Sequence, residues 1–154
     1  FLDKIKNKIK FYKNSGFFVD LLVNELNNKS DFYSKFIKYV NTKDVLYLGP
    51  NYADDSELNP IKYKYFIKLL SKDCFTEFKD ILDKVDKYAC EINCVICQGG
   101  FGVKPVMFEI FKKYPNVWIF DIGSSIDYFF NKKSRKYLKN ISKSIPVENV
   151  KNNI

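Results

Sequence analysis

The sequence predicts an α/β protein, in which a small Rossmann-like parallel sheet is flanked by helices and preceded by further helices. Three observations support this fold class. Short apolar runs alternate with amphipathic segments between residues 45 and 120, which is the pattern of strands connected by helices. Two of the runs end in Gly49-Pro50 and in the glycine-rich turn 99–102, as buried parallel strands often do. The length of 154 residues fits a single domain with one core of moderate size.

The first 44 residues are predicted to be helical. Residues 1–14 have apolar positions at helical spacing with lysines opposite, which indicates an amphipathic helix; a helix on a membrane surface is the alternative. Ser15-Gly16 should break it, and a second helix is predicted over 17–26. Ser30 or Asp31 caps a third helix. The apolar stripe of this third helix is formed by Phe32, Phe36, Ile37 and Val40.

Residues 45–137 are predicted to form the Rossmann-like core, followed by a polar tail over 138–154. Pro105 fits only in the first turn of a helix, and Pro115 should end that helix. Because the chain begins with Phe1 rather than Met, one interpretation is a fragment of a longer protein. The expected order of elements is strand 45–48, strand 65–70, helix 75–88, strand 94–98, helix 102–114 and strand 117–120.

Polar and glycine-rich segments follow three of the predicted strands. They are Gly49 to Asn51, the turn 99–102, and the segment Asp121 to Asp127. The carboxyl ends of parallel strands border the ligand crevice, so these segments should lie on one side of the molecule. Glycines permit positive φ and close backbone approach, and the N–H groups at the start of the next helix suit an anion such as a diphosphate. Lys104 would add positive charge there.

Charge and composition narrow the class of partner. The net charge is +8, yet Arg135 is the one arginine among 26 basic residues, and the lysines are dispersed over the whole chain. This favours a solvated lysine surface over a specific nucleic-acid site. The sequence has no apolar run of about 18 residues and no signal-peptide pattern, which predicts a protein without a transmembrane segment.

The cysteines and the missing histidines limit the chemistry. Cys94 and Cys97 form a C-x-x-C pair inside an apolar strand pattern, so all four cysteines, with Cys74 and Cys90, are interpreted as buried small hydrophobic residues. Reduced thiols predict a cytoplasmic location. A chain without histidine cannot supply a Ser-His-Asp triad or a histidine base, so an acid or base must be Asp, Glu, Lys, Tyr or Cys.

The acidic loop after residue 51 contains Asp55-Ser56-Glu57. This D-x-E spelling is the one by which metal-dependent sugar transferases hold a divalent cation on a diphosphate. Short triplets of this kind also occur by chance, and a solvated acidic loop is the alternative interpretation.

Residues 31–137 resemble the carboxyl-terminal half of the GT-D-type glycosyltransferase domain and its relatives in polysaccharide biosynthesis. The resemblance rests on VLYLGPN at 45–51, on VICQGGFGVKPVMFEIFKKYPNVWIFDIGSSIDYF at 95–129 and on SRKY at 134–137. Its most specific element is Asp121-Ile122-Gly123-Ser124 with Asp127.

The resemblance implies transfer of a sugar from a nucleotide-sugar donor to a hydroxyl group of a glycan acceptor. A divalent metal, Mn or Mg, would neutralise the diphosphate leaving group. Asp121 or Asp127 would act as acceptor base or as ribose or sugar ligand. If the acidic loop replaces the family's metal motif, Asp55 and Glu57 would hold the metal. The expected substrate-binding residues are Gly49, Asn51, Gln98, Gly99, Gly100, Gly102, Lys104, Gly123, Ser124 and Arg135.

One departure from the family leaves alternatives open. The family's acidic metal motif stands upstream of the Gly-Pro strand, and nothing in residues 1–44 matches it. The motif is then missing, or Asp55-Ser56-Glu57 replaces it, or the chain binds without catalysing. Asp121 has a structural alternative as a helix cap or loop-organising carboxylate.

Two other functions remain as hypotheses. The first is another Rossmann-like enzyme, such as a methyltransferase or an NAD-dependent enzyme, with the same glycine turn. Asp121, 19 residues after Gly102, stands close to the usual position of a ribose ligand. The second is a non-catalytic binding module, which includes weak nucleic-acid binding through the lysine surface.

Overall fold

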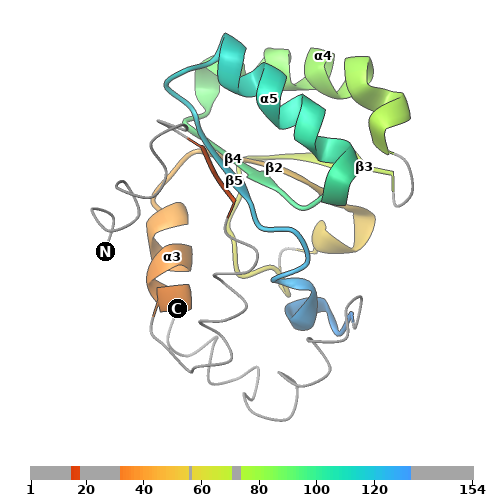
Figure 1. Cartoon of the computed structure of the whole chain (residues 1–154). Helices are drawn as coiled ribbons and strands as arrows, with labels where there is room; N and C mark the ends of the chain where they lie inside the picture. Colours follow the sequence, from red (N-terminus) through yellow and green to blue (C-terminus); the bar gives the residue numbers. More distant parts are fainter. Residues whose placement is uncertain (1–14, 18–31, 56, 71–73, 133–154) are drawn as a thin grey trace.

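The protein is built around a five-stranded, all-parallel sheet with helices on both faces (Figure 1). We describe a computed structural model that places residues 15–17, 32–55, 57–70 and 74–132. The strands stand in the order β1-β5-β4-β2-β3. Their bounds are β1 Ser15–Phe17, β2 Val45–Pro50, β3 Tyr65–Leu69, β4 Cys94–Cys97 and β5 Trp118–Asp121. The predicted α/β class with a small Rossmann-like sheet is confirmed.

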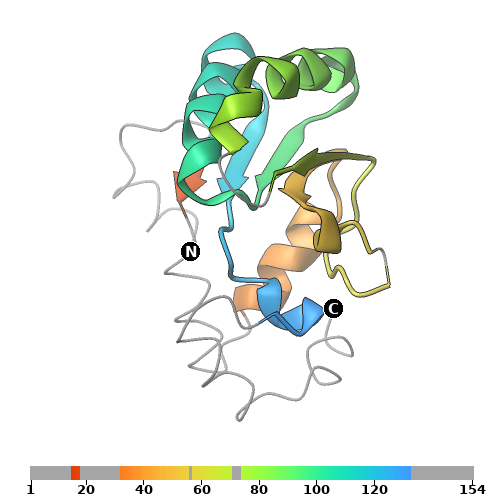
Figure 2. The same cartoon turned by 90° about the vertical axis from the view of Figure 1, so that its right-hand side faces the viewer.

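Three α-helices and several short 3-10 turns complete the described part of the chain. Figure 2 shows α4 and α5 together on one face of the sheet and α3 on the other. The helices are α3 Phe32–Val40, α4 Phe78–Tyr88 and α5 Lys104–Lys113. The 3-10 turns are η1 Asn51–Ala53, η2 Cys74–Glu77, η3 Ala89–Glu91, η4 Gly100–Val103 and η5 Asp127–Phe130. Within these described residues, no helix has the length and apolar character needed to cross a bilayer.

Most predicted elements of the core form where the sequence pattern put them. The helices predicted over 75–88 and 102–114 begin with 3-10 turns and become α-helical at Phe78 and Lys104. Pro105 stands in the first turn of α5, where its missing N–H costs no hydrogen bond. The helix predicted to start at Phe17 is wrong at that residue, because Phe17 pairs with Asp121 as the last residue of β1. The helices expected over 1–14 and 18–26 lie outside the described residues.

Strand residues alternate between two apolar layers. In β2, Val45 and Tyr47 pack on the α3 face, whereas Leu46 and Leu48 pack beneath α4 and α5. All four are buried, as expected for a strand covered on both faces. This double coverage explains why the strands read as continuous apolar runs rather than as alternating patterns.

The chain leaves β2 and β4 toward opposite faces of the sheet. After β2 it passes through η1 to the α3 face, where Ala53 and Ile61 join the core formed with Ile37. After β4 it enters η4 and α5 on the opposite face, where Val106 joins the other core. Because β2 and β4 are hydrogen-bonded neighbours, their carboxyl ends form a topological switch point. In open α/β sheets, this is the place where ligands bind.

Candidate functional site

A chain of buried polar side chains lies at the switch point between β2 and β4. The Tyr47 hydroxyl donates a hydrogen bond of 2.6 Å to Gln98 Oε1. Gln98 Nε2 in turn donates to Asp127 Oδ1 at 2.5 Å. Gln98 directly follows β4 and is only 5% exposed, so its amide is committed to these two partners. The bonds connect β2, the end of β4 and the 3-10 turn η5.

Asp127 is the acceptor on which this chain of side chains ends. Its Oδ1 atom also accepts a hydrogen bond of 2.9 Å from the Tyr52 hydroxyl in η1. Asp127 is 2% exposed, so these donors replace the water that an ionised carboxylate otherwise needs. Burial, and then the charge of Asp127, raise the pKa of Tyr52 far above its usual range. Tyr52 is therefore a neutral donor at all physiological pH values.

A second carboxylate, Asp121, holds the glycine turn to the end of β5. Its Oδ2 atom forms an ion pair with the Lys104 ammonium at the start of α5. Its Oδ1 atom accepts the N–H of Gly123 at 3.0 Å, which closes the loop where Gly123 has a φ of 46°. Asp121 is 1% exposed, whereas part of the Lys104 side chain reaches solvent. Burial lowers the pKa of Lys104 below its usual value.

These contacts confirm that the glycine turn and the aspartate segment share one edge of the sheet. Lys104 contacts Asp121, and Gln98 contacts Asp127, although each pair is far apart in the sequence. Gly49, in β2, lies at the same edge because its strand runs parallel to β4. The three segments predicted to converge therefore do so.

The glycine turn is closely packed on its inner side and open on its outer side. A Cβ atom on Gly102 would lie 2.6 Å from the Cys74 sulfur and 3.3 Å from the backbone nitrogen of Phe75. Gly100 has a φ of 59°, and nothing lies within 4 Å of the position its Cβ would take. The turn is thus fixed against η2 while one side of its backbone remains accessible.

Other predicted site residues are less closely connected. Asn51 is exposed in η1, and Ser124 is half-buried beside Gly123. Arg135 lies outside the described residues. Ser125 directly follows Ser124. Its hydroxyl is fully buried and has no hydrogen-bond partner in the placed part of the chain.

The acidic loop organises its own backbone. Asp55 Oδ1 accepts the N–H groups of Glu57 at 3.1 Å and of Leu58 at 3.4 Å. No group of three or more Cys, Asp and Glu side chains positioned for a metal ion occurs in the segments that the structure places. Asp55 and Glu57 therefore lack a third protein carboxylate or thiolate among those segments with which to form a metal site.

The four cysteines, all within the described residues, form no disulfide bond. Cys74, Cys94 and Cys97 are buried as predicted, and burial raises the pKa of Cys94 to about 12. Cys90 is exposed in η3, so its predicted burial is wrong. The 3-10 turn carries its side chain away from the apolar layer that its neighbour Ile92 enters.

Sequence patterns did not single out Tyr47 or Tyr52 as members of the site. Tyr47 stands 51 residues before Gln98, and Tyr52 stands 75 residues before Asp127. The available signal was a tyrosine inside an otherwise apolar strand, since a buried phenol usually finds a hydrogen-bond partner. Naming that partner required the three-dimensional structure.

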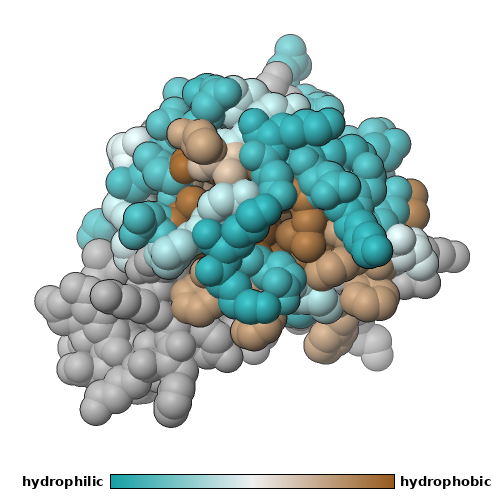
Figure 3. All heavy atoms as spheres, turned by 90° about the horizontal axis from the view of Figure 1, so that it is seen from above, coloured by the Kyte–Doolittle hydropathy of each residue, from teal (hydrophilic) through white to brown (hydrophobic). Residues whose placement is uncertain are grey.

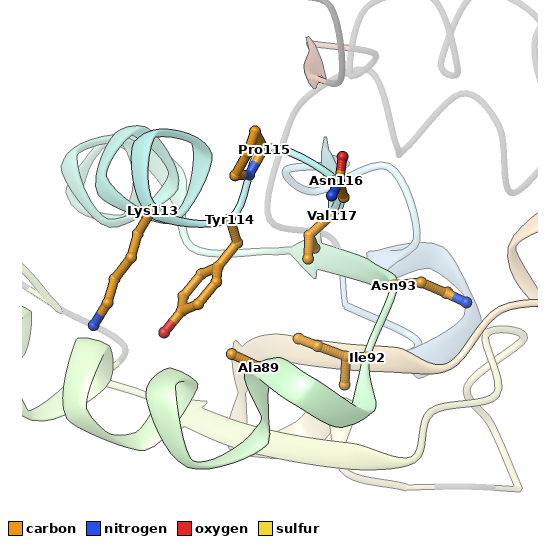
Figure 4. Close-up of a pocket in the computed structure, with 8 residues that line it drawn as sticks. All are labelled: Ala89, Ile92, Asn93, Lys113, Tyr114, Pro115, Asn116 and Val117. Atoms are coloured by element: carbon orange, nitrogen blue, oxygen red, sulfur yellow. The ribbon is translucent and has the colours of Figure 1, made fainter.

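A pocket of about 370 Å³ lies at the other edge of the sheet (Figure 4). Lys113 and Tyr114 border it, and both are hydrogen-bonded to Asp86. Asn93 and Val117 place it at the amino ends of β4 and β5, away from the glycine turn. It is therefore separate from the predicted site. Its lining residues are Ala89, Ile92, Asn93, Lys113, Tyr114, Pro115, Asn116 and Val117.

The fold and the site define a small, doubly wound parallel α/β protein with a buried polar network at its switch point. No family model, curated protein or solved structure matches the chain. A function for this protein is therefore inferred from the contacts at the switch point.

Proposed function

We propose that the protein is a nucleotide-sugar-dependent glycosyltransferase, or the donor-binding part of one. The observation that carries this proposal is the convergence of the glycine turn with the Asp121–Asp127 segment at the switch point. The two segments are connected by the Lys104–Asp121 ion pair and the Gln98–Asp127 hydrogen bond. A crevice at this position is where open α/β sheets bind phosphorylated ligands.

The diphosphate of the donor would bind at the glycine turn. The N–H groups at the start of η4 and α5 carry partial positive charge, and the open side of Gly100 lets a phosphate approach the backbone. Lys104 is half-buried beside this turn and would exchange its contact with Asp121 for a phosphate oxygen. In this proposal, Lys104 provides the positive charge that a leaving diphosphate requires.

Asp121 or Asp127 would accept the proton of the attacking hydroxyl. Their ordinary pKa of about 4 lies far below that of an alcohol, so proton transfer must accompany departure of the diphosphate. Both carboxylates are nearly inaccessible, at 1% and 2% exposure, so the acceptor must gain access to one of them. If Asp121→Asn and Asp127→Asn variants of the complete protein both keep full transfer rates, the assignment of the base is wrong.

Ligand binding provides the first test. Thermal unfolding should be measured with UDP- and GDP-sugars, with and without Mg²⁺ or Mn²⁺, and in parallel with S-adenosylmethionine and NAD. We expect a nucleotide sugar to raise the melting temperature of the wild-type protein. Stabilisation by S-adenosylmethionine or NAD alone contradicts the proposal.

A variant of Lys104 and a control variant of Lys112 show whether Lys104 takes part in nucleotide-sugar binding. Lys104→Met combined with Asp121→Asn removes the cation without leaving a buried carboxylate unpaired, and should abolish stabilisation by nucleotide sugars. Lys112→Met is the control on the same helix, because Lys112 pairs with Glu109 at the surface. Equal stabilisation of both variants by the nucleotide sugar would remove Lys104 from the site.

One observation favours a second candidate, an enzyme that uses S-adenosylmethionine or NAD. Asp121 ends β5, the strand next to the one that carries the glycine turn, which is the position of a ribose-binding carboxylate. However, its oxygens already contact Lys104 and Gly123. In addition, Pro105 occupies the place of the third glycine in a G-x-G-x-x-G turn. The geometry therefore supports this candidate less well.

A further inference from the structure

The glycine turn presents an aromatic ring to solvent. Phe101 is 92% exposed, although burying such a side chain would contribute about 2 to 3 kcal/mol to folding. Phe75, in η2, is 55% exposed, and Leu70, just after β3, is 46% exposed. In Figure 3, seen from the side of α4 and α5, the surface is mainly hydrophilic, and apolar residues show between the hydrophilic ones in several places.

The turns that carry Phe101 and Phe75 pack against each other. The position of a Cβ on Gly102, the residue after Phe101, lies 3.3 Å from the Phe75 backbone nitrogen. The Cys74 thiol donates a hydrogen bond of 3.6 Å to the carbonyl of Gly99. The Phe75 ring is also supported by Phe78, with ring centres 5.9 Å apart. Both exposed rings thus project from a fixed part of the backbone.

We propose that Phe101 and Phe75 form a stacking platform for the nucleobase of a nucleotide. The inference rests on the proposed function, because the diphosphate would lie on the backbone of the same turn. An aromatic face binds any nucleobase by stacking, without a need for hydrogen bonds from the protein. Phe101 is part of the phosphate-binding turn itself, which places its ring within the reach of a base attached to that diphosphate.

The small apolar area that Phe101, Phe75 and Leu70 expose favours a small planar ligand over a second protein molecule. Three partly exposed apolar side chains, at about 150 to 250 Å² for each aromatic ring, offer less than the roughly 800 Å² per partner of a stable interface. A second copy of the chain is therefore an outcome of the test rather than the proposed occupant.

The chain provides a matched control for the platform. Phe108, on the outer side of α5, is 59% exposed, and its ring lies under the Lys112 ammonium at 5.4 Å from the ring centre. It has the same chemistry as Phe101 but belongs to the helix beyond the turn. A general loss of surface hydrophobicity would affect both residues, whereas loss of a base-stacking ring affects Phe101 alone.

The experiment compares UDP, GDP and inorganic pyrophosphate by isothermal titration calorimetry, with wild-type protein and with Phe101→Ala, Phe75→Ala and Phe108→Ala. We expect Phe101→Ala to weaken UDP or GDP binding roughly five- to hundredfold, with a smaller effect for Phe75→Ala. Pyrophosphate binding should be unchanged in every variant, and Phe108→Ala should bind nucleotides as the wild type does. Phe101→Trp should retain affinity and show fluorescence quenching on nucleotide addition.

Each result has a definite meaning. If the wild type binds nucleotides and Phe101→Ala binds them equally well, the platform is wrong and the proposed function stands. Equal loss of pyrophosphate and nucleotide affinity in Phe101→Ala also overturns the platform, because the turn itself is then disturbed. A concentration-dependent dimer that Phe101→Ala abolishes, as seen by size-exclusion chromatography, assigns the patch to a second copy instead. Absence of binding of all three ligands to the wild type overturns the proposed function together with this inference.

Discussion

The buried network can be tested by replacing Gln98 with leucine. The new side chain is one bond shorter and has no polar atoms, so it removes the bonds from the Tyr47 hydroxyl and to Asp127 Oδ1 together. Tyr47 is fully buried, and its hydroxyl loses this acceptor where water cannot replace it. Asp127 keeps the hydrogen bond from the Tyr52 hydroxyl but loses the one from Gln98 Nε2.

The expected cost follows from these contacts. A hydrogen bond to a charged group contributes about 1.5 to 3 kcal/mol and a neutral one about 1 kcal/mol. A buried polar atom left without its partner costs about 1 to 3 kcal/mol more, and burial of the leucine side chain offsets about 1 to 2 kcal/mol. We therefore expect Gln98→Leu to lower the free energy of unfolding by about 2 to 6 kcal/mol. Domains are stable by only about 5 to 15 kcal/mol, so the change is large.

A glutamate at the same position makes the network sensitive to pH. In Gln98→Glu the new carboxyl would meet Asp127 Oδ1 at close range, and two adjacent carboxylates cannot both ionise without a large cost. The pair must retain a proton, so its folded pKa is raised above the unfolded value of about 4.3 for Glu. Stability relative to the wild type is therefore highest below about pH 4 and falls as the pH rises through the folded pKa.

The assay is urea unfolding, followed by the fluorescence of Trp118, the single tryptophan of the chain. Tyr63→Phe is the control, because the Tyr63 hydroxyl donates to Asp54 at 2.8 Å near the surface, where water can replace it. It should cost less than about 1 kcal/mol. If Gln98→Leu is no more destabilising than Tyr63→Phe, the network does not hold the switch point together.

Three further outcomes follow from the same structure. Lys104→Met should lower the unfolding free energy by about 2 to 4 kcal/mol because it leaves the buried carboxylate of Asp121 unpaired, and adding Asp121→Asn should restore more than half of this in urea titrations. Gly102→Ala should cost about 1 to 3 kcal/mol, because its Cβ would lie 2.6 Å from a sulfur atom; a wild-type melting temperature contradicts this contact. Burial raises the pKa of the Cys94 thiol from 9.0 to about 12. The stability that the protonated thiol contributes is therefore complete below about pH 9 and is lost toward pH 12. The free energy of unfolding should fall there by up to about 1.4 kcal/mol per pH unit. Cys94→Ala should reduce that slope.

Local patterns were sufficient for the elements of the core. Each of β2 and β4 is a short apolar run that ends at a glycine or at a glycine-rich turn, so their existence and direction of exit were readable. Pro105 placed the first turn of α5 within two residues. In contrast, β1 has no strand signal, because it is three residues long and includes Gly16. It forms because the edge of β5 offers backbone hydrogen-bond partners.

The sequence by itself determined the fold class and the edge of the sheet where the polar segments gather, because hydrophobic periodicity and glycine turns are local properties of the chain. Only the tertiary structure decided how those residues pair. Gln98 with Asp127, Tyr47 with Gln98, and Lys104 with Asp121 are contacts across different strands and turns. A side chain's spacing in the sequence fixes the face it occupies, but its partner depends on which elements the sheet brings side by side.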